Sequence, residues 1–306
     1  MSALSSVNDL LQQFCRRKPM RGGSLIVTLF GDSISQHGNQ VWLGDVIRVL
    51  EPFGLNQRLV RTSVYRLIQE GWLQAEQVGR RSYYRFSDFG LRHYQRAARR
   101  IYGLQSETWD NQWTLVMPAQ LADEQREALR KELLWLGYGA LVPGVLAYPR
   151  GEHEALAETL GELGVADKVI VMRACTDEIC VAGTVRRQAY NCWRLNELEA
   201  RYRDFLNQFR PLLESLATAP LADEQCFQLR TLLIHEYRRI LLKDTELPVE
   251  LLPEDWAGAA AQGLTAELYR LVHRGALNFI ERELQHVGGT LPPPQQEYFD
   301  RFGGLG

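Results

Sequence analysis

The most restrictive feature of the chain is a run of three short helical segments that leads into a β-hairpin, all within residues 24–86. Apolar residues recur with a helical period in segments 24–35 and 42–51, so each segment is expected to bury one face. Asn56 is a suitable N-cap for a third helix that runs to about Glu70. The sequence therefore predicts a small three-helix unit ahead of the hairpin.

Two short strands are predicted at 73–78 and 82–86, with Gly79-Arg80-Arg81 as the turn between them. Glycine supplies the backbone freedom that a tight hairpin turn requires. A further helix is expected over about 88–103, because Ser87 and Asp88 can cap it. The order of helix, helix, helix, strand, basic turn and strand is typical of a winged helix-turn-helix, which we assign to residues 20–103.

The third helix and the turn carry side chains suited to DNA. A recognition helix lies in the major groove, where long hydrogen-bond donors reach base edges and phosphates. A wing would place its basic turn against the minor groove or the backbone, and one of Tyr83 and Tyr84 must face the core. The candidate DNA contacts are Gln57, Arg58, Arg61, Thr62, Ser63, Arg66, Arg80, Arg81 and Tyr83.

Charge is unevenly distributed along the chain, although the net charge is only −2. Residues 48–103 hold 11 arginines, no lysine and four carboxylates, for a net charge of +7. Residues 1–47 add +1, so the remainder carries −10. A basic segment on an acidic body indicates a local contact with a polyanion. A solvated, arginine-rich helix surface would have the same composition, but the absence of lysine and the basic turn favour DNA.

Residues 109–175 predict a second domain of the ferredoxin-like kind. The β-α-β-(β)-α-β order of apolar strands and amphipathic helices suits that small α+β fold. The expected strands are 113–117, 140–142, which can continue through 145–147, and 168–172; the expected helices are 122–136 and 152–163.

From residue 178 to residue 306 the sequence predicts a mainly helical domain for effector binding and dimerisation. The tail from Pro292 onward is expected to be irregular. The fold class is therefore multidomain α+β. The helices are expected near 178–190, 195–217, 222–243, 258–273 and 275–285.

Signals for enzymatic activity are weak. The string His235-Glu236-Tyr237-Arg238-Arg239 begins like the zinc motif HExxH but has arginine where the second ligand is needed. The first strand of the middle domain ends in Val116-Met117-Pro118-Ala119, without the acidic metal ligand that a Cas2-type nuclease would need. The five cysteines are scattered, and none has CxxC spacing. We expect no catalytic residue, no metal and no cofactor.

No stretch of the sequence approaches the roughly 20 apolar residues of a membrane span. The first residues also lack the basic and apolar regions of a secretory signal. We therefore expect a cytoplasmic protein with reduced thiols and no membrane partner.

Several unusual strings are spread over almost the whole chain. They include Leu29-Phe30-Gly31-Asp32-Ser33, Trp42-Leu43-Gly44, Glu70-Gly71-Trp72-Leu73, Gly79-Arg80-Arg81-Ser82, Gly164-Val165-Ala166-Asp167, Phe209-Arg210-Pro211-Leu212, Leu232-Leu233-Ile234-His235 and Arg301-Phe302-Gly303-Gly304-Leu305. In this order, they resemble the PaaX family of repressors of phenylacetate catabolism.

The resemblance implies a GntR-like winged helix, a Cas2-like middle domain and a helical C-terminal domain. It also implies a homodimer that represses a phenylacetate operon and is released by phenylacetyl-coenzyme A. One small winged helix reads too few bases to select a promoter, so we expect a palindromic double-stranded operator with the dimer contact outside residues 24–86.

A coenzyme A thioester offers phosphates to arginines and a phenyl ring to an apolar pocket. The candidate effector contacts are Arg210, Arg238 and Arg239 for the phosphates, with His235 and Trp256 nearby. Two other classes of protein stay open at this point: a nucleic-acid-processing protein and an enzyme that acts on a coenzyme A thioester.

Overall fold

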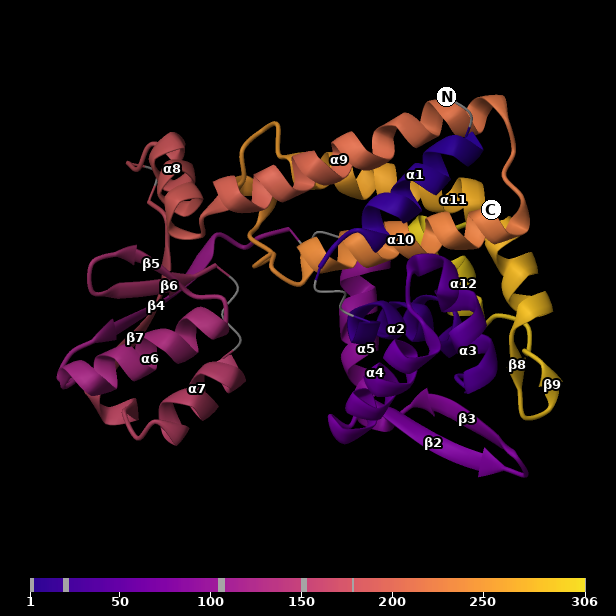
Figure 1. Ribbon diagram of the computed structural model, residues 1–306. Helices are drawn as coiled ribbons and strands as arrows, with labels where there is room; N and C mark the ends of the chain where they lie inside the picture. The colour runs from indigo at the N-terminus through magenta and orange to yellow at the C-terminus, as the bar shows by residue number, and fades with distance from the viewer. Residues whose placement is uncertain (1–2, 19–21, 104–107, 150–152, 178, 306) are drawn as a thin grey trace. The chain divides into compact units, whose positions relative to one another are not determined.

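The computed structural model describes residues 3–18, 22–103, 108–149, 153–177 and 179–305. It is a mixed helix-and-sheet structure that divides into two compact units (Figure 1). Unit 1 comprises residues 1–104, 202–242 and 258–306, and unit 2 comprises residues 105–201 and 243–257. Among the described residues, no helix is both long and apolar enough to cross a membrane.

The N-terminal part of unit 1 contains the predicted helices and a further helix that was not predicted, α1. The apolar stripe of α1 is Val7, Leu10, Leu11 and Phe14, all buried. The third predicted helix is present as α4, and its cap is confirmed, because Asn56 Oδ1 accepts a hydrogen bond of 2.9 Å from Leu59 N. The elements are α1 (Ala3–Cys15), α2 (Gly22–Asp32), η1 (Ile34–Gln36), α3 (Leu43–Leu50), η2 (Glu51–Phe53) and α4 (Gln57–Gln69).

The predicted hairpin is present as β2 (Leu73–Val78) and β3 (Arg81–Phe86), which pair antiparallel. Val78 pairs with Arg81, so the turn is Gly79-Arg80 alone, and Arg81 is the first residue of β3 rather than part of the tip. Gly79 has a φ of +61°, which the first central position of a type II′ turn requires. A third strand, β1 (Val41–Trp42), pairs with β3 and gives the order β1-β3-β2.

Three further helices belong wholly or mainly to unit 1: α5 (Asp88–Tyr102), α10 (Asp223–Leu241) and α11 (Ala257–Glu283). The sequence predicts two helices at 258–273 and 275–285, but α11 is continuous through Gly275. A Cβ at Gly275 would lie 2.7 Å from Sγ of Cys226, so this glycine permits a close approach to α10 rather than ending a helix.

The tail was expected to be irregular, and this was wrong. It follows a short hairpin and forms two short helical turns, and its side chains Tyr298, Arg301 and Phe302 are buried. Residues with large apolar or π surfaces fold onto a core when one is available, even without regular secondary structure. The elements are β8 (Gln285–His286), β9 (Gly289–Thr290), α12 (Gln296–Phe299) and η5 (Arg301–Gly303).

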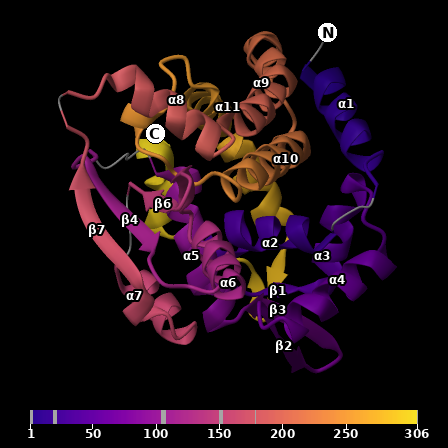
Figure 2. The same ribbon diagram turned by 90° about the vertical axis from the view of Figure 1, so that its left-hand side faces the viewer.

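Unit 2 contains the predicted β-α-β-β-α-β order, which is confirmed. Its four-stranded sheet is antiparallel with the order β5-β6-β4-β7, and β4 and β7 run side by side in Figure 2. Leu129 and Leu133 of α6 and Leu156 and Leu160 of α7 pack in one core with Val116 of β4. The elements are β4 (Gln112–Pro118), α6 (Asp123–Trp135), β5 (Gly139–Val142), β6 (Val145–Tyr148), α7 (His153–Glu162), η3 (Ala166–Lys168) and β7 (Val169–Cys175).

Two more helical elements complete unit 2. Helix α8 (Ala182–Cys192) and the turn η4 (Val249–Leu251) contribute Ala189 and Leu251 to a second core with Trp113 and Ala147. Helix α9 (Leu195–Thr218) begins in unit 2 and ends in unit 1.

The packing differs from the expected division into 20–103, 109–175 and 178–306. Most of the C-terminal helical region packs in unit 1 with α1 to α5 instead of forming a compact unit of its own. The reason lies in α10, which is buried over most of its length, polar positions included. A helix that is buried on nearly all sides must lie inside a core.

Candidate nucleic-acid interface and buried charge cluster

One face of α4 is buried and the opposite face is exposed and basic. Val60, Val64 and Leu67 point into unit 1, and their spacing of three and four residues matches one side of a helix. The closeness of α2 and α4 shows at Gly22, where a Cβ would lie 2.7 Å from Ser63 Oγ. The predicted contacts on the exposed face are Gln57, Arg58, Arg61, Thr62 and Arg66.

Two predicted DNA contacts lie in the interior instead. Ser63 is 7% exposed because it faces α2, and Tyr83 is 5% exposed because it is the inward residue of β3. Tyr65 was not among the predicted DNA contacts, yet this residue is 63% exposed. Its spacing from Arg61 and Thr62, four and three residues, places it on their side of the helix and could have identified it.

The two arginines of the hairpin differ in their surroundings. Arg80 is exposed in the turn. Arg81 stacks on Trp42, with its Cζ 4.5 Å from the ring centroid, and its Nη1 donates a hydrogen bond of 3.2 Å to Gln285 Oε1. Arg80 is therefore free to meet a phosphate, whereas part of the donor capacity of Arg81 is used within the protein.

A second set of polar contacts ties α3 to the segment after α11. The buried carboxylate of Asp45 accepts hydrogen bonds of 2.9 Å from Arg48 Nη2 and from the backbone N of Gln285. Arg48 also forms an ion pair with Glu283. Side chains of α3 thus fix this helix to the end of α11 and to the start of the hairpin β8–β9, which are far away in the sequence.

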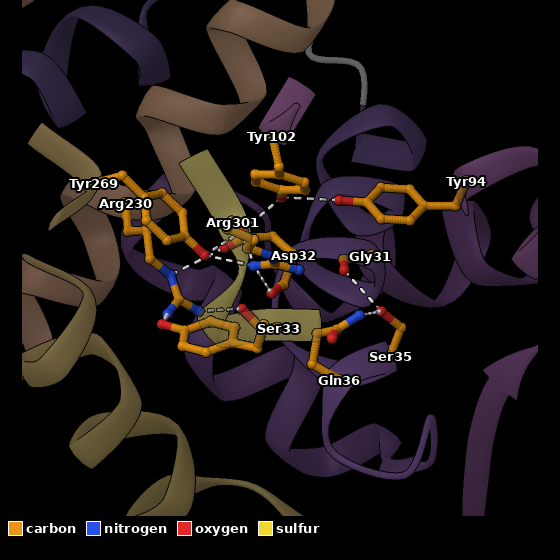
Figure 3. Close-up of polar contacts among 11 residues, drawn as sticks. Gly31, Asp32, Ser33, Ser35, Gln36, Tyr94, Tyr102, Arg230, Tyr269 and Arg301 are labelled. Carbon is orange, nitrogen blue, oxygen red and sulfur yellow. Dashed lines mark hydrogen bonds and ion pairs between the residues drawn. The ribbon is translucent and has the colours of Figure 1, made fainter. Parts of the chain in front are cut away.

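The most unusual feature of unit 1 is a buried charge cluster around Asp32, the last residue of α2 (Figure 3). Asp32 Oδ1 accepts hydrogen bonds from Tyr102 (2.6 Å), Tyr269 (3.0 Å) and Arg301 Nη1 (2.9 Å). Asp32 Oδ2 lies 3.0 Å from Arg230 Nε. One carboxylate thus pairs with two buried guanidinium groups, and the cluster keeps an excess positive charge.

Hydroxyl groups accept hydrogen bonds from both terminal nitrogens of Arg230. Arg230 Nη1 donates to Tyr298 (3.0 Å) and its Nη2 donates to Ser33 (2.8 Å). Tyr94 lies 3.0 Å from the hydroxyl of Tyr102, which itself donates to Asp32. Buried charges persist in proteins only when such partners are present.

The electrostatics of the cluster follow from this geometry. Burial by itself lowers the pKa of the Arg230 guanidinium, but the Asp32 carboxylate together with Tyr269 and Tyr298 more than offsets this and raises it above its usual value. Burial raises the pKa of Tyr102 well above its usual value and raises that of Tyr94 to about 12. Near neutral pH the arginines are therefore charged and the tyrosines neutral.

Gly31 shows how closely this region is packed, because a Cβ at this position would lie 1.9 Å from the ring of Tyr94. No local sequence pattern predicts the cluster, since Asp32 and Arg301 are 269 residues apart. A signal was nevertheless present, because Gly31-Asp32-Ser33 and Arg301-Phe302-Gly303 belong to the strings that carry the family resemblance.

Two predicted effector contacts on α10 face the interior of unit 1. His235 is buried, and burial followed by the charges of Arg239, Arg238 and Arg17 lowers its pKa to about 3. Its Nδ1 lies 3.2 Å from Thr28 Oγ1, which already donates to the carbonyl of Ser24, so the neutral ring donates to Thr28. Arg238 is also buried, and its Nη1 lies 3.4 Å from the carbonyl oxygen of Ser24.

The other predicted effector contacts lie elsewhere. Arg239 forms an exposed ion pair of 3.3 Å with Glu236, and Arg210 is exposed on α9. Trp256 belongs to unit 2 and is buried there. Within the described ranges, no three His, Cys, Asp or Glu side chains gather as metal ligands would.

Comparison with known proteins places the chain among transcription regulators of one type. Three family profiles match in order: a PaaX-like protein profile at residues 21–90, a PaaX central Cas2-like domain profile at 106–182 and a PaaX-like C-terminal domain profile at 193–282. The chain is 40% identical over 304 residues to the transcriptional repressor PaaX of Escherichia coli strain K12, covering 99% of this chain and 96% of that protein.

A solved structure has a similar fold. The uncharacterized protein Rv0674 from Mycobacterium tuberculosis superposes with a TM-score of 0.51 at 21% identity, over 82% of this chain and 95% of that one. At this identity the likeness concerns the fold alone.

Proposed function

The chain belongs to the PaaX family, and we propose on that premise that it is a cytoplasmic transcriptional repressor whose α4 and β2–β3 hairpin form a winged helix on operator DNA. The observation that carries this proposal is the exposed face of α4, on which Arg58, Arg61 and Arg66 have no buried role. A regulator of this family works by binding and release, so no catalytic residue is required.

The proposed DNA contacts follow from the exposed residues. Arg61 and Arg66 supply forked donors suited to guanine O6 and N7, and Gln57, Arg58 and Thr62 lie beside them. Tyr65, on the same face, adds one hydroxyl and a ring edge. Arg80 in the hairpin turn meets phosphates or the minor groove. Ser63 and Tyr83 support the fold and do not touch DNA.

We further propose that the protein acts as a homodimer on a palindromic operator and that phenylacetyl-coenzyme A releases it. The support is the family resemblance and the need for two half-sites. The effector must bind the DNA-incompetent state more tightly than the competent one, since equal binding would shift nothing. The exposed Arg210 and Arg239 stay candidates for its phosphates, whereas Arg238 and His235 already have partners in α2.

Four arginine variants test the DNA interface by mobility shift at several salt concentrations. Arg61→Ala and Arg66→Ala should each weaken specific binding roughly tenfold or more, because a good bidentate base contact contributes about 1–3 kcal/mol. Arg80→Ala should weaken binding to all sequences and reduce the salt slope by about one. Arg130→Ala, an exposed arginine of unit 2, is the control and should bind as wild type. Unchanged affinity in every variant would overturn the winged-helix assignment.

The effector is tested on the same operator fragment. Phenylacetyl-coenzyme A should release the protein, whereas free phenylacetate, which lacks phosphates, should not. Chromatography should recover the thioester intact. Steady hydrolysis by catalytic amounts of protein, or equal release by the free acid, would instead favour the enzyme alternative.

A further inference from the structure

A cavity of about 640 Å³ lies between α5 and the C-terminal segment 295–301, entirely within unit 1. Its volume is in the range of pockets that hold small organic molecules. Helix α5 lines it with Arg92, Arg96 and Arg99, while Tyr102 and Arg301 of the Asp32 cluster also border it. None of the residues predicted from the sequence as effector contacts borders this cavity.

The three arginines of α5 are spaced by four and three residues, so they project from one face of the helix. Like charges at such positions repel one another and destabilise a helix. Within the described part of the chain, none of the three forms an ion pair, although Glu297 and Asp300 border the same cavity. This is an arrangement that an anionic ligand would stabilise.

We propose that this cavity binds a small organic anion that bears phosphate groups, and that the anion draws Arg301 and Tyr102 away from Asp32. Guanidinium groups on one helix face match the spacing of phosphate oxygens better than single ammonium groups do. The excess positive charge of the cluster and the partly polar border, which includes Gln36 and Gln295, favour the same ligand class.

The cavity also has a structural route to the DNA-binding face. Tyr102 and Arg301 both donate to Asp32, which ends α2, and α2 packs against α4 at Gly22 and Ser63. A ligand that competes for Arg301 alters the end of α2, and α2 supports the exposed face of α4. The regulatory part of this inference rests on the proposed function, whereas anion binding itself does not.

The double variant Arg92→Gln/Arg96→Gln tests the site, and Arg126→Gln/Arg130→Gln is its matched control. Both pairs are exposed arginines four residues apart on a helix, and the control pair lies on α6 of unit 2. Calorimetry would use pyrophosphate, coenzyme A and phenylacetyl-coenzyme A as separate probes. We expect at least one probe to bind the wild type, the α5 variant to bind it at least tenfold more weakly, and the control to bind within about twofold of the wild type.

Each other outcome is decisive. If no probe binds the wild type, or if the α5 variant binds every probe as the wild type does, the cavity is not an anion site. If the α5 variant instead loses operator affinity without any ligand while keeping its probe affinity, these arginines contact DNA and the proposal is overturned. If a probe binds at α5 but phenylacetyl-coenzyme A does not release the operator, the site stands and the proposed effector fails.

Discussion

Replacing Asp32 should destabilise unit 1 more than any other single substitution of a charged residue. Asp32 is the carboxylate on which both Arg230 and Arg301 depend, and Arg230 is fully buried. Removing one partner of a buried ion pair costs about 3–5 kcal/mol, because the remaining charge is left in a low-dielectric interior. Asp32→Ala leaves two such charges, so we expect a loss of about 5 kcal/mol, a large part of the stability of a typical domain.

The assay must report on the correct unit. Five of the seven tryptophans (Trp109, Trp113, Trp135, Trp193 and Trp256) belong to unit 2, so intrinsic fluorescence reports mainly on that unit. Hydrogen exchange of peptides from α2 and α10 reports on unit 1. Urea unfolding, monitored by circular dichroism, is measured beside it. Peptides of α2 and α10 should lose protection in Asp32→Ala, while those of β4 and β7 should not.

Two further variants separate the charge effect from the loss of packing. Asp32→Asn keeps the shape and one acceptor, so it should fall between Asp32→Ala and wild type. Glu254→Ala removes an exposed partner of Arg186, whose Nη1 lies 3.4 Å from Glu254 Oε1, and should have no measurable effect. A urea midpoint and slope for Asp32→Ala equal to those of wild type would refute the reasoning.

Two more predictions concern the solution behaviour of the protein. The pKa of His235 is lowered from 6.5 to about 3, so between these pH values the unfolded chain binds more protons than the folded one. The free energy of unfolding therefore keeps the whole His235 contribution above pH 6.5 and decreases on acidification. The decrease should be about 2 kcal/mol between pH 7 and pH 5. Urea midpoints of wild type and His235→Gln at the two pH values check this, and a variant with the full wild-type pH dependence would contradict it. Light scattering should report a dimer, free and on an operator with half-sites about 10 base pairs apart; a monomer in both conditions would remove the dimer from the proposal.

Local patterns in the sequence predicted the elements that depend on local chemistry. Helix α4 was predicted because Asn56 caps it and apolar residues repeat on one face, and β2 and β3 were predicted because Gly79 permits the turn. The order of elements in unit 2 followed from short apolar strands between amphipathic helices. Helix α1 has an equally clear apolar stripe at positions 7, 10, 11 and 14, although no helix was predicted there.

Features that depend on distant residues were not predictable in this way. Gly275 looks like a helix break until Cys226 is known to lie against it. Ser63 and Tyr83 look like DNA contacts because their side chains can donate hydrogen bonds, and only the packing of α2 and the register of β3 show that they face inward. The tail after Pro292 has no periodicity, so burial of Tyr298 and Phe302 left no local signal.

Two of the strings that carry the family resemblance supply residues of the Asp32 cluster. Gly31 permits the approach of Tyr94, Asp32 receives two arginines, and Arg301 arrives from a turn in which Phe302 has a φ of +54° and Gly303 and Gly304 also have positive φ. Such backbone strain in Phe302 persists only where surrounding contacts enforce it, and here its buried ring packs against Tyr102 and Tyr269. The cluster therefore holds α2, α10, α11 and the tail together, and a ligand that reaches Arg301 at the border of the α5 cavity acts on the same contacts that stabilise unit 1. Stability and anion binding therefore depend on the same residue, Arg301. A ligand that weakens the Asp32–Arg301 pair should also reduce the protection of α2 from hydrogen exchange.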